Sequence, residues 1–160
     1  MNSTLPEAVQ RAIGVTKKRR IEVTARDINR FAQAIGEMNP IHCDQDHARS
    51  SRYGGIVAPP LFCQTLTYED ASPDQLPADG SPLEIAVPVP AMRAVGGGSE
   101  YTIHRLVRAG DVIEIKSTLK DVHTKQGRSG LLYILVVETE FTDSDGRPVA
   151  TELATYIKRA

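Results

Sequence analysis

A carboxylate and an imidazole lie close together in the sequence, on either side of an Asn-Pro turn. Glu37 and His42 are five residues apart, and such a pair can hold one water molecule, one group accepting a proton while the other donates one. Pro59 and Pro60 follow and precede an apolar run; proline is favoured in the first turn of a helix, where its missing N–H has no partner anyway. The pattern indicates an acid/base pair facing a helix start. The alternative is a pair of ordinary surface residues.

The loop that carries Glu37 and His42 follows a predicted helix. Four apolar residues recur at the spacing of one helix face: Ile28, Phe31, Ala32 and Ile35. Thr24 and Asp27 are placed to cap the start of this helix, and Gly36 suits the left-handed backbone that commonly ends one. The pair therefore belongs to a loop that leaves a helix C-terminus, and not to a helix face.

Shorter elements are expected on both sides of that helix. Residues 1–19 are predicted to form a polar arm with a helical turn around Glu7–Ile13, and Arg20–Thr24 a short strand. Beyond the loop, Asp44 is placed to cap a short helix over Gln45–Ser51. The region before residue 59 thus supplies a helix and short connecting pieces, too little for a separate domain.

The second half of the chain changes from helical to strand-like patterns. The helix that begins at the two prolines is expected to reach about Asp70, followed by a proline-rich loop over residues 71–92. From Arg93 onward apolar and polar residues alternate, and Leu131–Val137 is a run of seven apolar residues, typical of a strand covered on both faces. Turn-like segments separate four long antiparallel strands, so the sequence predicts one α+β domain over residues 1–160.

The composition limits the classes of protein to which this chain is expected to belong. The 160 residues are 41% hydrophobic and 24% charged, with a net charge of −1, which fits one globular domain and gives no reason to expect nucleic acid or a membrane surface as a partner. No apolar run is long enough to span a membrane, and the N-terminal residues have no signal-peptide core. Two cysteines make no disulfide framework. A cytoplasmic protein with reduced thiols is expected.

Three segments carry a resemblance to a known family: FAQAIGEMNPIHCD, SRYGGIVAPPLF and VGGGSEYTIHRLVRAGDVIEI. They are similar to the MaoC-like hydratase/dehydratase family, and the likeness extends from Arg20 to Lys158. The resemblance implies the hotdog fold, in which a long antiparallel sheet wraps around one central helix. It also implies an activity on acyl thioesters.

The resemblance assigns roles to particular residues. Glu37 and His42 take the positions of the catalytic aspartate and histidine of R-specific enoyl-CoA hydratases, so glutamate here replaces aspartate. Pro60 stands where those enzymes have a glycine whose N–H starts the central helix. The residues expected to lie at the substrate are Asn39, Pro60, Leu61, Gly97 and Gly98. Asn39 is also expected to hold the turn through a side-chain hydrogen bond.

Three functions remain open at this point. The first is a hydro-lyase that adds water to 2-enoyl thioesters, or removes it from (R)-3-hydroxyacyl thioesters, with Glu37 and His42 as the acid/base pair. The second is a non-catalytic acyl-binding subunit of a two-part dehydratase, because such subunits often carry the Ala-Pro-Pro sequence found at residues 58–60. The third is a hotdog thioesterase. Proton transfer alone suffices for hydration, so no metal or redox cofactor is expected.

Other reactive side chains show no comparable pattern. His47, His104 and His123 lack the spacing of a metal site, and Cys43 is expected to point away from the preceding His42. Residues 96–98 are three glycines without the strand–loop–helix context of a phosphate loop. The arginines that could meet a coenzyme A or carrier-protein phosphate are Arg49, Arg52, Arg93 and Arg105.

A partner subunit is expected as well. A sheet of long strands with one helix leaves an open strand edge, and an open edge requires cover. The predicted assembly is a dimer whose sheets join edge to edge, either with a second copy or with another hotdog chain. The predicted substrate is an acyl-CoA or acyl-carrier thioester.

Overall fold

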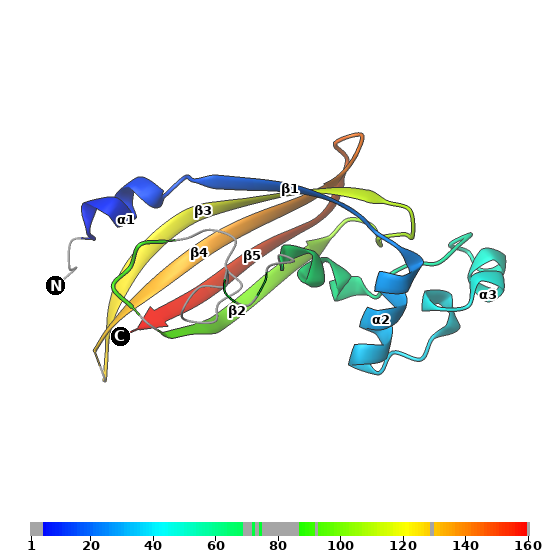
Figure 1. The fold of residues 1–160 in the computed structure, drawn as a ribbon, viewed down its shortest axis with the longest axis horizontal. Helices are drawn as coiled ribbons and strands as arrows, with labels where there is room; N and C mark the ends of the chain where they lie inside the picture. Colours follow the sequence, from blue (N-terminus) through cyan, green and yellow to red (C-terminus); the bar gives the residue numbers. More distant parts are fainter. Residues whose placement is uncertain are drawn as a thin grey trace.

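The computed structural model describes residues 5–68, 72, 74, 87–91, 93–128 and 130–159. Figure 1 shows the helices and strands that these residues form. The helices are α1 (Glu7–Ala12), α2 (Ala25–Ile35), the 3₁₀ helix η1 (Pro40–His42), α3 (Gln45–Ser50) and the 3₁₀ helix η2 (Pro60–Thr67). The strands are β1 (Thr16–Glu22), β2 (Arg93–Ile103), β3 (Val112–Gly127), β4 (Gly130–Asp143) and β5 (Pro148–Arg159).

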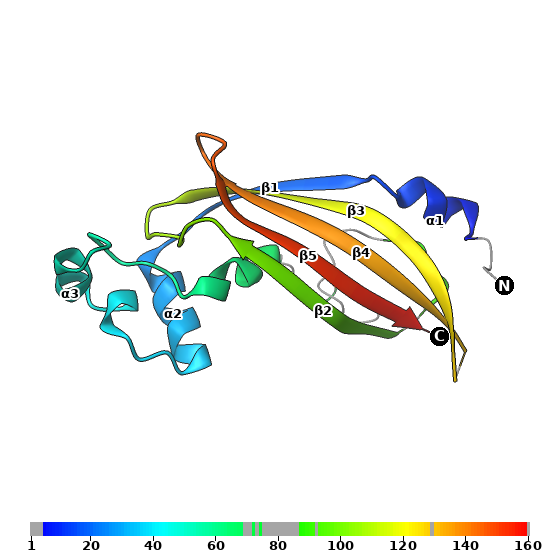
Figure 2. The same ribbon diagram turned by 180° about the vertical axis from the view of Figure 1, so that it is seen from behind.

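The strands form one five-stranded antiparallel sheet in the order β1-β3-β4-β5-β2. Figures 1 and 2 show a long, curved sheet, with α2 and α3 gathered beyond one of its ends and α1 near the other. β1 and β2 are its two edges. The predicted α+β class, with four long antiparallel strands after residue 92, is confirmed.

The N-terminal segment differs from the predicted polar arm. The helical turn exists as α1, but β1 begins at Thr16, before the expected Arg20, because Thr16–Glu22 pairs residue by residue with β3. Val9 of α1 is fully buried and belongs to the same apolar cluster as Leu119 of β3. The segment is therefore part of the packed fold.

The apolar run in β4 is covered mainly on one face. Tyr133, Leu135 and Val137 are buried, whereas the residues between them are only partly buried. The prediction of a strand fully covered on both faces was wrong for this chain, since side chains alternate across a strand and only one side of the sheet faces the core. We call that side the inner face.

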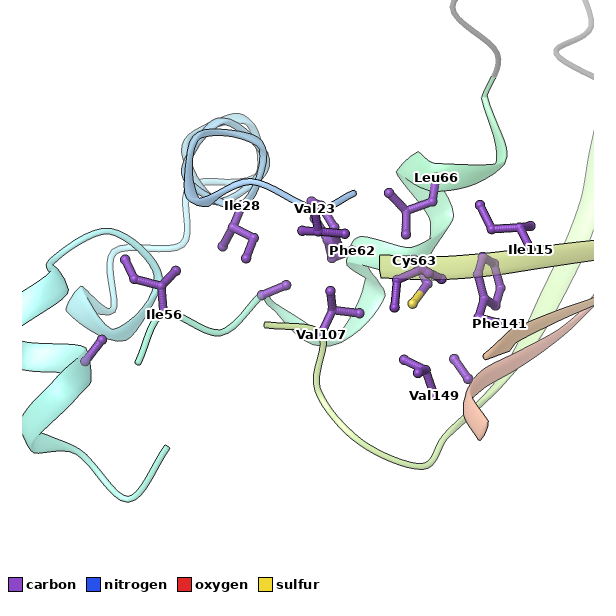
Figure 3. Packing of buried hydrophobic residues seen from close by; sticks show 14 residues of the cluster. Val23, Ile28, Ile56, Phe62, Cys63, Leu66, Val107, Ile115, Phe141 and Val149 are labelled. Atoms are coloured by element: carbon purple, nitrogen blue, oxygen red, sulfur yellow. The ribbon is translucent and has the colours of Figure 1, made fainter. Parts of the chain in front are cut away.

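Two apolar clusters cover the inner face. The first contains Val23, Ile28, Ala48, Ile56, Ala58, Phe62, Cys63, Leu66, Val107, Ile113, Ile115, Phe141, Val149 and Ala150. Figure 3 shows the side chains of η2 packed toward Ile115 and Phe141 of the sheet. The second contains Val9, Val87, Leu119, Val122, Tyr133, Leu135 and Val137. Burial of a side chain such as Phe62 contributes about 1.5–3 kcal/mol, so this packing helps to hold η2 against the sheet.

The helix η2 begins as predicted but is shorter and more tightly wound. Its last described turn contains Thr65 and Thr67, whose hydroxyls donate to the carbonyls of Phe62 and Gln64 at 2.7 and 2.8 Å. Side-chain bonds of this kind compete with regular helical bonding. Arg19 of β1 then donates to the carbonyls of Leu66 and Tyr68, which satisfies the helix C-terminus. The predicted end near Asp70 lies outside the described residues.

None of the helices in the described part of the chain is long and apolar enough to cross a membrane.

Candidate functional site

The helix that leads into the candidate loop is capped at both ends as the sequence predicts. The Thr24 hydroxyl accepts from the N–H of Asp27 at 3.2 Å, and the Asp27 carboxylate accepts from the N–H of Thr24 at 3.0 Å. Gly36 ends α2 with φ 72°. Ile28 and Ala32 are buried, but Ile35, the last residue of the predicted stripe, is 55% exposed. The caps fix where α2 stops and the loop begins.

The loop itself is held by two short-range hydrogen bonds. Oε1 of Glu37 accepts from the N–H of Asn39 at 2.9 Å, and Oδ1 of Asn39 accepts from the N–H of Ile41 at 3.2 Å. The second bond is the predicted turn bond of Asn39. Glu37 and Asn39 are both exposed, so the described contacts of Glu37 are with its own loop.

His42 lies in a different environment. Its side chain is buried, at 5% exposure, and Nδ1 lies 2.6 Å from the carbonyl oxygen of Val57. A carbonyl oxygen can only accept, so Nδ1 is the donor in this bond, and Nε2 is the nitrogen left for another partner. The N–H of Val57 returns a bond to the carbonyl of Ile41 at 3.3 Å. His42 therefore joins the loop to the segment that leads into η2.

The two candidate catalytic residues share a loop but not an environment. No hydrogen bond joins Glu37 to His42 among the residues that the structure describes, and one side chain is exposed while the other is buried. A shared water molecule requires both groups on one accessible surface. As described, the loop presents Glu37 to solvent and uses one nitrogen of His42 to hold the backbone.

The start of η2 has the expected proline arrangement. Pro59 is the N-cap residue and Pro60 the first residue of the helix, so neither supplies an N–H at the helix start. Leu61 is 48% exposed and carries the first N–H of this helix. The N–H of Ala58 donates to the carbonyl of Val107 at 2.8 Å, which fixes the approach to the helix.

The two glycines expected at the substrate lie on the edge strand β2. The strand shifts register between Gly96 and Gly98. A Cβ at Gly97 would lie 3.0 Å from both Cγ2 and the carbonyl oxygen of Thr155 in β5. The close approach of this neighbouring strand explains why the position requires a residue without a side chain. Gly98 has φ 146°, a conformation that favours glycine.

The arginines proposed for phosphate binding divide into two groups. Arg105 forms ion pairs with Asp111 at 2.6 Å and Asp143 at 3.5 Å, so its charge is already matched within the fold. The remaining three are exposed: Arg49, Arg52 and Arg93. Within the described ranges, no group of three or more His, Cys, Asp or Glu side chains is placed to hold a metal ion.

Sequence reasoning missed one set of buried polar residues. Ser117, Thr139 and Glu152 are 2%, 3% and 3% exposed and lie on adjacent strands of the inner face. Each occupies a position of its strand where the alternation predicts an apolar residue. This departure from the pattern was the signal that the sequence offered. Their alignment into one row depends on strand register, which the sequence does not display.

Comparisons with known proteins identify the family of this chain. The model of the family "FAS1-like, dehydratase domain region" matches residues 11–152. A "UPF0336 protein" of Thermobifida fusca is 32% identical over 138 residues, which cover 86% of this chain and 84% of that protein. The "3-oxo-4,17-pregnadiene-20-carboxyl-CoA hydratase alpha subunit" of Mycobacterium tuberculosis is 32% identical over 126 residues, which cover 75% of this chain and 40% of that subunit.

A solved structure shows the same likeness in three dimensions. The ChsH1-ChsH2 complex from Mycobacterium tuberculosis contains a chain that superposes with a TM-score of 0.74 and 27% identity, over 96% of this chain and 89% of that one. The hotdog architecture expected from the sequence is thus found in the sheet and in its structural neighbours. This chain belongs to the FAS1-like dehydratase-region family, within the MaoC-like hotdog hydratases and dehydratases.

Proposed function

We propose that this chain binds the acyl thioester in a two-subunit hydratase or dehydratase, and that a second hotdog subunit supplies the acid/base pair. The observation that carries the proposal is the unequal setting of the two candidate residues. Glu37 is exposed and bonded to its own loop at Asn39, whereas His42 is buried and bonded to Val57. A pair that holds one water molecule needs both groups on one surface, and this arrangement does not favour that.

The start of η2 supports the same conclusion. Adding water to an enoyl thioester places negative charge on the thioester oxygen, which the N–H groups at a helix start can stabilise. Pro59 and Pro60 provide no such N–H, and loss of one donor costs about 10²–10³-fold in rate. The N–H of Leu61 remains, so this helix start is suited to binding the thioester more than to activating it.

A second subunit has a place to bind on the sheet. β2 is an edge strand, and every residue from Val95 to Glu100 is exposed, so both faces of this stretch are uncovered in the single chain. An open edge of this length presents backbone N–H and C=O groups that favour pairing with another strand. The names of the alpha subunit and of the ChsH1-ChsH2 complex support an assembly of unlike subunits.

The second candidate is a self-sufficient (R)-specific hydro-lyase, and the tautomer of His42 favours it. With Nδ1–H bonded to Val57, Nε2 is available to accept a proton from water. Glu37 uses Oε1 for Asn39, which leaves its other oxygen for the same water. In dehydration the base removes the α-proton of a 3-hydroxyacyl thioester, and the acid protonates the leaving β-hydroxyl.

A hydration assay separates the two candidates. The purified chain is assayed with crotonyl-CoA and longer 2-enoyl-CoA thioesters, alone and together with any hotdog subunit that co-purifies from the native source. We expect slow or no hydration by the chain alone and a large increase with the partner. Release of free CoA instead of water addition would point to a thioesterase.

Two variants complete the assay. Fast turnover by the chain alone that disappears in His42→Ala would establish the self-sufficient hydro-lyase and overturn the binding-subunit proposal. Pro60→Gly restores an N–H at the helix start, so a gain in rate for this variant alone would show that the missing donor limits catalysis. If the unaltered chain does not bind acyl-CoA, both candidates are contradicted.

A further inference from the structure

A row of polar side chains crosses the inner face of the sheet. Ser117 of β3 is paired with Thr139 of β4, Thr139 with Glu152 of β5, and Glu152 with Tyr101 of β2. We call these four residues the polar row. The Ser117 and Thr139 hydroxyls lie 3.1 Å apart, and Ser117, Thr139 and Glu152 are all at most 3% exposed.

The polar row lies between the two apolar clusters. One step along the strands, on one side, Ile115 pairs with Phe141 in the first cluster. One step the other way, Leu119 pairs with Val137 in the second. Apolar residues at the row would have joined the two clusters into one core, because burial of apolar surface is the main favourable term in folding. The row interrupts that core at the cost of dehydrating polar groups.

One member of the row, Tyr101, has unused hydrogen-bonding capacity. Among the described residues, no ion pair reaches the Glu152 carboxylate, and the Tyr101 hydroxyl is buried without a hydrogen-bond partner. Burial, followed by the nearby Glu152 carboxylate, raises the pKa of Tyr101 well above its usual value. The phenol and the carboxylate are therefore close, although their geometry is not that of a hydrogen bond. A buried polar group normally has a partner, so the Tyr101 phenol can bind a further polar group beside the Glu152 carboxylate.

The row lies near η2, the helix at whose start the proposed function places the thioester. Tyr101 packs against the first cluster, which contains Cys63 of η2, so the row lies beside this part of the helix. Cys63 is the fourth residue of η2, counted from Pro60, and a 3₁₀ helix rises about 2 Å per residue. Cys63 therefore lies about 6 Å along the helix from its start.

We propose that Glu152 and Tyr101 form a subsite for a hydroxyl group carried by the acyl chain, beyond the carbons that react. A hydroxyl is the group that fits both residues: it donates to the Glu152 carboxylate and accepts from the Tyr101 phenol. A plain hydrocarbon would offer no hydrogen bond to either residue. The inference rests on the proposed function, because it places the thioester at the start of η2.

A binding series tests the subsite without requiring turnover. Decanoyl-CoA is compared with hydroxydecanoyl-CoA isomers that carry the hydroxyl at successive carbons beyond the β-carbon, using the chain with any subunit that co-purifies with it. We expect one isomer to bind about tenfold more tightly than decanoyl-CoA, since hydrogen bonds to charged groups contribute at least that much. No preference for any isomer, with decanoyl-CoA binding intact, would overturn the subsite and leave the proposed function standing. No binding of any thioester would overturn both.

Single substitutions test whether Tyr101 and Glu152 cause the preference for a hydroxylated acyl chain. Tyr101→Phe removes only the phenolic oxygen, and Glu152→Gln removes only the charge; each is expected to reduce the hydroxyl preference several-fold while decanoyl-CoA binding is kept. Tyr133→Phe is the control, because Tyr133 is a buried tyrosine on the same face of β4 but outside the row. An unchanged preference in both row variants would refute the assignment. Tyr101→Phe alone decides the matter if Glu152→Gln does not fold.

Discussion

His42 and Val57 are joined by a hydrogen bond of 2.6 Å, from Nδ1 to the carbonyl oxygen, across fifteen positions of the chain. Val57 also forms an isolated bridge with Arg108. The loop after α2, the segment before η2 and the turn before β3 are thereby connected through one residue. The histidine that the sequence suggests as a catalyst is thus also a structural tie, and its substitution affects both roles.

The structural role of His42 predicts a measurable loss of stability. In His42→Ala the buried Val57 carbonyl loses its partner, which costs about 1–3 kcal/mol in the free energy of unfolding. Urea denaturation measures this loss. His47→Ala is the control, because His47 is exposed on α3 and its loss is expected to cost less than about 0.5 kcal/mol. A His42→Ala chain as stable as the unaltered one would show that the bond contributes nothing.

The glycine run in β2 predicts different outcomes for neighbouring substitutions. A methyl group at Gly97 would lie 3.0 Å from the Thr155 backbone oxygen, whereas one at Gly96 would meet nothing within 4 Å. Gly97→Ala is therefore expected to destabilise the chain by about 1–3 kcal/mol and to weaken any association through β2. Gly96→Ala should leave thermal unfolding nearly unchanged. Thermal melts and sedimentation compare the two, and equal melts would contradict the close approach to Thr155.

The two cysteines are expected to differ in reactivity. Burial raises the pKa of Cys63 to about 12, while Cys43 is exposed. Iodoacetamide should therefore modify Cys43 in the native chain and Cys63 only after unfolding, as mass spectrometry of the digested protein would reveal. The Cys43→Ser variant should stay unmodified until it unfolds. Rapid native labelling of Cys63 would show that η2 opens readily.

The same thiol makes stability depend on pH. The folded pKa of Cys63 lies above the ordinary value of 9.0, so its contribution is fully present below pH 9 and is lost as pH rises toward about 12. The slope in this window approaches about 1.4 kcal/mol per pH unit. Denaturant titrations above pH 9 are expected to show a smaller loss in Cys63→Ala than in the unaltered chain. Equal losses would assign the effect to other groups.

The cap of α2 predicts a modest, local effect. Thr24→Ala removes the hydroxyl that accepts from the N–H of Asp27, at a cost of about 1 kcal/mol. Hydrogen exchange should then accelerate first in the amides of α2. Thr67→Ala is the comparison, because the Thr67 hydroxyl bonds to a carbonyl of its own helix at 2.8 Å and does not serve as a helix cap. A smaller loss in Thr24→Ala than in Thr67→Ala would contradict the importance of the cap.

The sequence by itself determined those features that depend on near neighbours in the chain. The capping pair of Thr24 and Asp27, the left-handed Gly36, the turn bond of Asn39 and the first-turn position of Pro60 were all predicted and are all present. Each depends on residues within about four positions of one another, whose side chains reach the same backbone groups in almost any fold. The alternation after residue 92 likewise predicted the strands, because side chains of a strand alternate between its two faces.

Only the tertiary structure decided how distant segments meet. The bond from His42 to Val57, the approach of Thr155 to Gly97 and the alignment of Glu152 with Tyr101 all join residues that are far apart in the chain. The two contacts within the sheet depend on strand register, and a shift of one residue moves every side chain of a strand to the other face. Residue types therefore suggested the chemistry, whereas the pairing of strands decided which polar groups are buried together.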